Sequence, residues 1–165
     1  MRHTATFTSP LPINPLDELE DLISGQGFSY LRFEDEIIVR YPKILENLQS
    51  LWVWDKTHNS FEVSASSLLK IPKSKKQDIF ELLALINEHL WVGHFDLSDE
   101  ECPTFRHVNL VGDSSSSIPA IVEDMFAIVL YEYQRFKPAF DYVIKHHKSP
   151  QEAIKLALIE PQGEA

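Results

Sequence analysis

The sequence has one cysteine, few glycines and no long hydrophobic run. Cys102 is the only cysteine among 165 residues, which excludes an intramolecular disulfide and favours a reducing compartment. Three acidic residues precede it directly at positions 99–101, and nearby negative charge raises the pKa of a thiol. Although His107 is close in sequence, we interpret Cys102 as a structural residue and not as a nucleophile.

Glycine-based motifs are also absent. The five glycines are too dispersed to form a phosphate-binding loop, and no serine is flanked by the glycines of a nucleophile elbow. The acidic clusters at 34–36 and 99–101 are typical of solvent-screened turns. The sequence therefore predicts no catalytic residue and no cofactor-binding residue, and we expect a protein that is not an enzyme.

Membrane and nucleic-acid signals are lacking as well. No apolar stretch approaches the roughly 20 residues of a transmembrane helix, and the N-terminus lacks the apolar run of a secretory signal, so we expect a cytoplasmic protein. The net charge of −10 and the shortness of the basic clusters exclude nucleic acid and anionic membranes as partners. A basic or amphipathic protein partner is compatible with this charge.

The length and composition are those of a single domain. With 165 residues, of which 44% are hydrophobic, the chain can bury a sizeable core. We assign this domain to residues 14–160. Residues 1–13 contain two prolines and show no hydrophobic period, so we expect a flexible N-terminal arm there.

The first half of the domain predicts a helix followed by four strands. Asn14 is a suitable helix cap, Pro15 suits the first helical position, and Gly25 is placed to end the helix. The hydrophobic period then changes to two, which predicts two hairpins. Their strands are expected at residues 28–33 and 37–41, and at residues 51–54 and 61–65.

The second half predicts two more strands and three helices. Ser74 and Gln77 have the spacing of a capping box, as do Ser149 and Glu152. Pro138 interrupts the longest helical stripe, so we expect a kink or a break there. The expected segments are a helix at 74–90, strands at 91–97 and 104–111, a loop at 112–117, and helices at 118–146 and 149–158.

This order of elements predicts the fold class. Strands and helices do not alternate, which favours an α+β fold with an antiparallel sheet and helices packed on one face. The expected order is α-ββββ-α-ββ-α-α.

Seven histidines invite a metal site, but their spacing disfavours one. His89 and His94 are five residues apart, whereas two ligands on one helix face are four apart, and no second cysteine supplies a thiolate set. We therefore expect no metal site. A weaker alternative is an enzymatic histidine–carboxylate site formed by His89, His94, Asp96 and His107. It is conceivable because His94 and Asp96 share a strand face and His107 lies across a predicted hairpin.

Aromatic residues are more informative about function. Trp52 and Trp54 are two apart on a predicted strand, so they share one sheet face, and Leu51 and Val53 share the other. If helices cover one face, one of these pairs lies on the open face, where it is either core-like or available to a partner. Large aromatics and arginines are favoured at interfaces. The candidate partner-binding residues are Trp52, Trp54, Trp91, Arg40 and Arg106.

The long helix raises the question of a subunit interface. Its main stripe is supplemented by Phe126, Leu130 and Tyr131, which makes residues 125–133 nearly apolar all round. A helix of this kind requires cover on both sides, and a second subunit is one source of that cover. We therefore predict a homodimer whose candidate interface residues are Phe126, Leu130, Tyr131 and Tyr133.

Several segments resemble the bacterial YbjN-like family. The most specific is Asn87-Glu88 followed by Leu90 and by Gly93-His94-Phe95-Asp96, and further similar segments lie at 16–19, 27–28, 37–41, 105–107 and 149–153. The family is described as sensory-transduction regulators, and its fold is similar to that of type III secretion chaperones. The resemblance implies a chaperone-like fold and a dimer, and it brings no catalytic residue, because none is known to us in the family.

Two functions follow as expectations. The favoured one is a non-enzymatic protein-binding or chaperone-like regulatory module. The alternative is a small-molecule sensor domain with a regulatory output, which requires an enclosed apolar pocket with a few polar groups. The identity of the partner or ligand is not encoded in any motif.

Overall fold

The computed structural model describes residues 14–42, 45, 48–67, 69–112 and 117–159. The predicted order of a helix, four strands, a helix, two strands and two helices is confirmed. The predicted arm at 1–13 and most of the predicted loop at 112–117 lie outside the described residues. The elements are α1 (Pro15–Gly25), β1 (Ser29–Arg32), β2 (Glu36–Arg40), β3 (Gln49–Asp55), β4 (Ser60–Ser66), the 3₁₀ turn η2 (Lys73–Lys75), α2 (Lys76–Glu88), β5 (His94–Leu97), β6 (Pro103–Leu110), α3 (Ile118–Lys145) and α4 (Pro150–Ile159).

Six strands form one antiparallel sheet in the order β1-β2-β3-β4-β6-β5. Both predicted hairpins, β1–β2 and β3–β4, are present. The strand β6 pairs with β4 on one side and with β5 on the other, so β1 and β5 are the edge strands. The fold is therefore α+β with an antiparallel sheet, as the sequence predicts.

Side-chain caps begin the first and last helices as predicted. Asn14 Oδ1 accepts a hydrogen bond from the backbone N–H of Leu16 at 3.0 Å, which satisfies a donor that the helix itself leaves free. At α4, Ser149 Oγ accepts from Glu152 N and Glu152 Oε2 accepts from Ser149 N, at 3.3 and 3.2 Å. This reciprocal pair is a capping box.

Two local predictions about helices are corrected. Ser74 and Gln77 do not form a capping box, because Ser74 lies inside η2 and Lys75 precedes α2 without a side-chain cap. The break predicted at Pro138 is absent, because α3 continues through this residue, while the alternative of a kink stays a prediction. A proline deprives the carbonyl four residues earlier of its helical hydrogen bond. Here that carbonyl belongs to Gln134, an exposed residue of α3.

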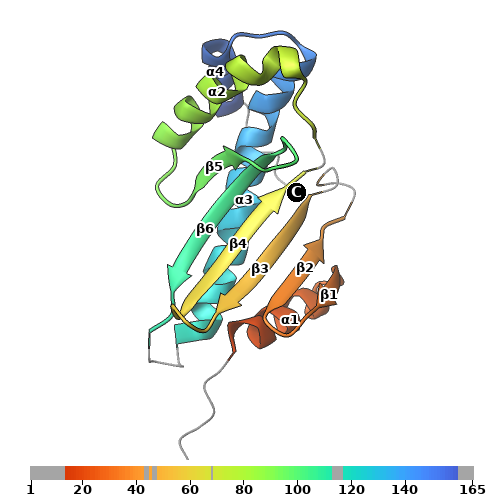
Figure 1. Cartoon of the computed structure of the whole chain (residues 1–165), viewed down its shortest axis with the longest axis vertical. Coiled ribbons are helices and arrows are strands. Elements are labelled where there is room, and N and C mark those ends of the chain that lie inside the picture. The colour runs from red at the N-terminus through yellow and green to blue at the C-terminus, as the bar shows by residue number, and fades with distance from the viewer. Residues whose placement is uncertain (1–13, 43–44, 46–47, 68, 113–116, 160–165) are drawn as a thin grey trace, which may run out of the picture.

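The helices α1 and α3 cover one face of the sheet. Figure 1 shows α3 running behind β6 and β4, while α2 and α4 pack together at one end of the sheet. On the covered side, α1 contacts β1 through a hydrogen bond from Tyr30 to Glu20 and an ion pair between Arg32 and Asp17. The buried strand residues on this face include Ile37, Val39, Trp52, Phe61, Val63 and Phe105.

An aromatic cluster joins α3 to this covered face. Phe126 of α3 stacks on Trp52 and Tyr41 at centroid distances of 6.2 and 5.9 Å, and it meets Phe28 edge-on at 5.6 Å. Burial raises the pKa of Tyr41 to about 12, although its hydroxyl contacts Ser50 at 3.0 Å. The long helix is thus anchored to the sheet by aromatic packing.

The opposite face of the sheet faces the viewer in Figure 1, and in the described part of the chain no helix lies over it. We call it the open face.

Candidate functional site

The strand register determines which side chains lie on the open face. Leu31, Ile38 and Leu51 are direct cross-strand neighbours on β1, β2 and β3. The same row continues with Ser64 on β4 and Arg106 on β6. This row therefore changes from apolar to polar across the sheet.

Four apolar side chains form a continuous surface on the open face. Leu31, Ile38 and Leu51 are joined by Val53, two residues further along β3, and we call these four residues the apolar patch. Leu31 is 48% exposed, and the other three are half-buried. The solvent-facing side of an antiparallel sheet is usually polar, so this patch is unexpected for a face that only contacts water.

Carboxylates border the apolar patch on one side. The cross-strand neighbours of Val53 are Glu36 on β2 and Glu62 on β4. Glu36 is exposed and Glu62 is half-buried, and Glu62 accepts a hydrogen bond from Ser60 Oγ at 2.8 Å. Neither carboxylate forms an ion pair with any described residue. Both charges are therefore available to a binding partner.

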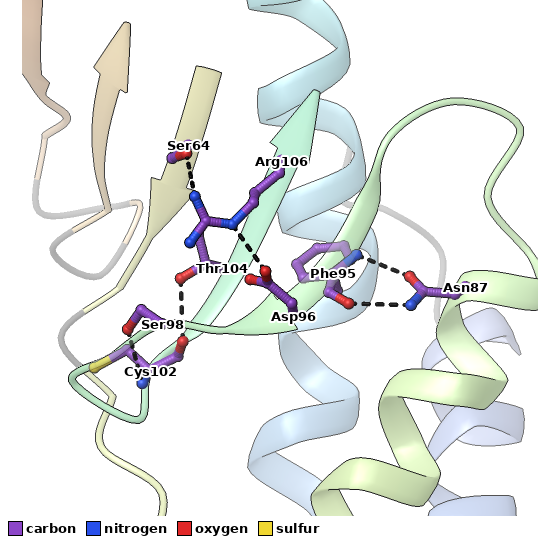
Figure 2. A network of polar contacts seen from close by, with 8 residues as sticks. All are labelled: Ser64, Asn87, Phe95, Asp96, Ser98, Cys102, Thr104 and Arg106. Carbon is purple, nitrogen blue, oxygen red and sulfur yellow. Dashed lines mark hydrogen bonds and ion pairs between the residues drawn. The ribbon is translucent and has the colours of Figure 1, made fainter. Parts of the chain in front are cut away.

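Arg106 is held in place at the polar end of the row. Its Nε donates to Asp96 Oδ2 and its Nη1 donates to Ser64 Oγ, both at 2.8 Å (Figure 2). Asp96 and Ser64 come from β5 and β4, the two strands that flank β6. The guanidinium group is thus held by both neighbouring strands and lies across the open face.

A hollow of about 400 Å³ lies next to Arg106. Cys102 in its wall is buried, and burial, followed by the charge of Glu100, raises the pKa of its thiol. This agrees with the interpretation of Cys102 as a structural residue. The lining is mostly polar, unlike the apolar pocket that a small-molecule sensor requires. It consists of Gln49, Ser66, Ser67, Ser98, Asp99, Glu100, Cys102 and Arg106.

The most specific segment of the sequence, around Asn87 and Gly93, performs a structural task. Asn87 Oδ1 accepts from Phe95 N at 2.8 Å, and Asn87 Nδ2 donates to Phe95 O at 3.0 Å (Figure 2). Gly93 has a φ of +67°, and a Cβ at this position would lie 2.6 Å from the carbonyl oxygen of Arg106 and from the ring of Phe105. The segment therefore fastens β5 to α2 and β6.

The structure separates the five candidate partner-binding residues. Arg40 and Arg106 lie on the open face. Trp91 is 76% exposed in the connection between α2 and β5. Trp52 is fully buried and donates its indole N–H to Ser50, so it has no surface to offer a partner. Trp54 is half-buried against the core.

Burial removes Trp52 from the candidate partner-binding residues, because helices cover the sheet face that carries both β3 tryptophans. The residues between and beside them, Leu51 and Val53, lie on the open face instead. The two-residue spacing predicted that one of the two pairs, Trp52 with Trp54 or Leu51 with Val53, would lie on the open face.

The candidate dimer residues are also divided. Phe126 and Tyr133 are buried within the subunit, because the sheet, α1 and α4 already cover α3. They are therefore not available to a second subunit, which corrects the interface predicted for them. Leu130 is half-buried and Tyr131 is 54% exposed.

The alternative histidine–carboxylate site is not assembled. His94 and Asp96 share the open face, as predicted, but the residue opposite His94 is Arg106. His107 pairs with Val63 on the covered face, where burial lowers its pKa. The described residues contain no group of three or more histidine, cysteine or acidic side chains that could hold a metal ion.

Sequence reasoning did not single out Leu31, Ile38, Glu36 or Glu62. The period-two alternation assigned Leu31, Ile38 and Glu62 to strand faces. Glu36 was expected in the acidic turn at 34–36, whereas the structure makes it the first residue of β2. However, only the position of α3 determines which face is open.

Comparison with known proteins identifies the family. The model of the YbjN family, described as "Putative bacterial sensory transduction regulator", matches residues 15–141. The chain belongs to the YbjN family.

Two solved structures are similar to this YbjN-family chain. The first is "Crystal structure of YbjN, a putative transcription regulator from E. coli", with a TM-score of 0.49 and 14% identity over 72% of this chain and 87% of that one. The second is an uncharacterized protein from Methanothermobacter thermautotrophicus, with a TM-score of 0.37 and 10% identity over 73% and 96%. No curated protein matches. The similarity to type III secretion chaperones stays a prediction.

None of the helices among the described residues of this YbjN-family chain is long and apolar enough to cross a membrane.

Proposed function

We propose that this YbjN-family chain is a cytoplasmic, non-enzymatic regulatory module that binds another protein on the open face of its sheet. The apolar patch is the observation that carries this proposal. Apolar area removed from water contributes roughly 25 cal/mol per Å², and contiguous exposed apolar surface marks interaction sites in soluble proteins. The regulator description of the family supports a binding role over a catalytic one.

Arg106 supports the same surface. Because Asp96 and Ser64 already hold its guanidinium, a partner that contacts it loses little side-chain entropy on binding. A side chain held in this way beside an apolar surface resembles the anchors of protein interfaces. Arg40, on the same face, is an exposed candidate for a contact at the edge of the interface.

Photo-cross-linking in native cells tests this proposal. A photoreactive amino acid replaces Leu31 in one strain and Leu158, an exposed leucine of α4, in another. We expect a reproducible cross-linked protein from position 31 and none from position 158. No cross-linked protein from position 31, or the same products from both positions, would overturn the open face as the docking surface.

The homodimer is a separate proposal. Of the four residues predicted for it on α3, Tyr131 and the half-buried Leu130 remain on the surface. This area is smaller than the four-residue interface that the sequence predicted, so a dimer formed here needs further contacts from neighbouring elements.

A further inference from the structure

We infer that the protein segment bound by the open face is amphipathic and basic, with apolar side chains on the apolar patch and cationic side chains against Glu36 and Glu62. This inference rests on the proposed function, and it adds the chemistry of the partner. It follows from how charge is arranged around the patch.

Glu36 and Glu62, which we call the acidic border, adjoin the apolar patch. Val53 lies between Glu36 and Glu62 in one cross-strand row, and side chains paired across strands are about 5 Å apart. A cationic side chain that reaches either carboxylate therefore belongs to the same segment that covers Val53. Glu62 already accepts from Ser60 Oγ at one oxygen, which leaves its second oxygen for a partner.

The acidic border extends to the adjoining end of the sheet. Asp35 lies in the β1–β2 turn there and Asp55 ends β3, but Lys56 and His58 pair with them at 2.6 and 2.7 Å. Glu34 is exposed and in no ion pair with a described residue. The unpaired charge on this flank of the patch is therefore negative.

The opposite flank of the patch differs. Arg40 is the last residue of β2 and lies on the far side of Ile38 from Glu36. Its cross-strand neighbours are Ser29 and Gln49. The patch is therefore bordered by carboxylates on one side and by an arginine among neutral residues on the other. This asymmetry orients a bound segment, because its cations are drawn to one flank only.

A second copy of this chain fits the surface less well than a basic segment. The chain carries a net charge of −10, so two copies repel each other, whereas a cationic segment is attracted at long range. Electrostatic complementarity of this kind raises association rates and selects among partners.

Synthetic peptides test the inference by fluorescence anisotropy. The first is a peptide of about 18 residues, five helical turns, with leucine at every third or fourth position and lysine between. The second carries glutamate in place of lysine, and the third has the composition of the first in scrambled order. The proteins are the full chain, the double variant Glu36→Gln/Glu62→Gln, and Leu51→Thr, which introduces a polar β-branched residue that suits a strand.

Matched control variants are Glu88→Gln and Leu158→Thr, which change an exposed carboxylate of α2 and an exposed leucine of α4. Melting curves confirm that every variant is folded. We expect the lysine peptide to bind, about three- to tenfold more weakly to Glu36→Gln/Glu62→Gln and about tenfold or more weakly to Leu51→Thr. The controls should bind as the unmodified chain does, and the other two peptides should bind weakly.

Three results would overturn the inference. Equal binding of the lysine and glutamate peptides would show that the surface does not select a basic partner. Lysine-peptide binding that no open-face variant weakens would place the contact elsewhere. A dimer that Leu51→Thr converts to a monomer in light scattering would make a second copy the occupant. If cross-linking from position 31 still yields a partner in any of these cases, the proposed function survives, and only the chemistry of the partner is wrong.

Discussion

The side-chain amide of Asn87 pairs with both backbone groups of Phe95, accepting from its N–H at 2.8 Å and donating to its carbonyl at 3.0 Å. Since β5 is an edge strand, these backbone groups point away from the sheet and would otherwise be free to pair with another chain. The side-chain amide of Asn87 on α2 thus makes the hydrogen bonds that a seventh strand would make at this point. It protects the edge from unintended strand addition.

Replacing Asn87 should therefore destabilise the domain. Asn87→Ala removes two hydrogen bonds and leaves two part-buried backbone groups without protein partners, which costs about 1–3 kcal/mol of unfolding free energy. Urea denaturation measures the loss. Asn87→Asp should not restore stability, because a carboxylate accepts from Phe95 N but cannot donate to Phe95 O. The neighbouring substitution Glu88→Ala, at an exposed residue, is the control, and an equal loss there would contradict the assignment.

Gly93 should tolerate no side chain. Its φ of +67° disfavours other residues, and an added Cβ would lie 2.6 Å from backbone and ring atoms of β6. We expect Gly93→Ala to lower the unfolding free energy by about 2 kcal/mol or more. Gly25→Ala is the matched control, because a Cβ there meets nothing within 4 Å. Similar melting temperatures for the two variants would show that the close approach at Gly93 is not a constraint.

Glu132 is a fully buried carboxylate on α3. Burial raises its pKa, although Arg135, whose Nη1 donates to Glu132 Oε2 at 3.3 Å, opposes the shift. Its other oxygen has no hydrogen-bond partner among the described residues. The Glu132 carboxyl group therefore holds its proton more tightly in the folded protein than in the unfolded chain. In consequence, the contribution of Glu132 to stability is greatest at low pH and falls as the pH rises above about 4.3, the unperturbed glutamate value.

Glu132→Gln should remove this pH dependence. The variant should be more stable than the unmodified chain at pH 7, by on the order of 1 kcal/mol, and the difference should shrink towards pH 4. Denaturation curves at several pH values measure both effects. Glu123→Gln, at an exposed position of the same helix, should change neither. A Glu132→Gln variant that is less stable at pH 7 would show that the pair with Arg135 outweighs the cost of burying the charge.

The homodimer is tested by light scattering on the purified chain. The expected result is twice the chain mass of 19.0 kDa over a wide concentration range. Tyr131→Glu should shift the mass towards the monomer, because it places a charge on the exposed part of α3. A monomer at all concentrations would exclude the dimer, and a dimer unaffected by Tyr131→Glu would move the interface away from this helix.

Local chemistry determined much of this fold from the sequence alone. The capping of α1 by Asn14 and of α4 by Ser149 depends on residues within three positions of each other, and so does the alternation that defines each strand. The order of elements follows from these short-range patterns, and the spacing of Trp52 and Trp54 correctly predicted that one pair of β3 side chains would face away from the other.

The tertiary structure alone decided which side of that alternation is covered. The two-residue alternation of a strand requires Leu51 and Trp52 to point in opposite directions. Both residues are apolar, however, so the pattern does not indicate which of the two faces is covered. The packing of α3 settles it by burying Trp52 against Phe126 and leaving Leu51 beside Ile38 on the open face. Likewise, Glu36 and Glu62 are 26 positions apart in the sequence and become neighbours of Val53 only when three strands pair. The candidate site is built from such long-range contacts, which no local pattern encodes.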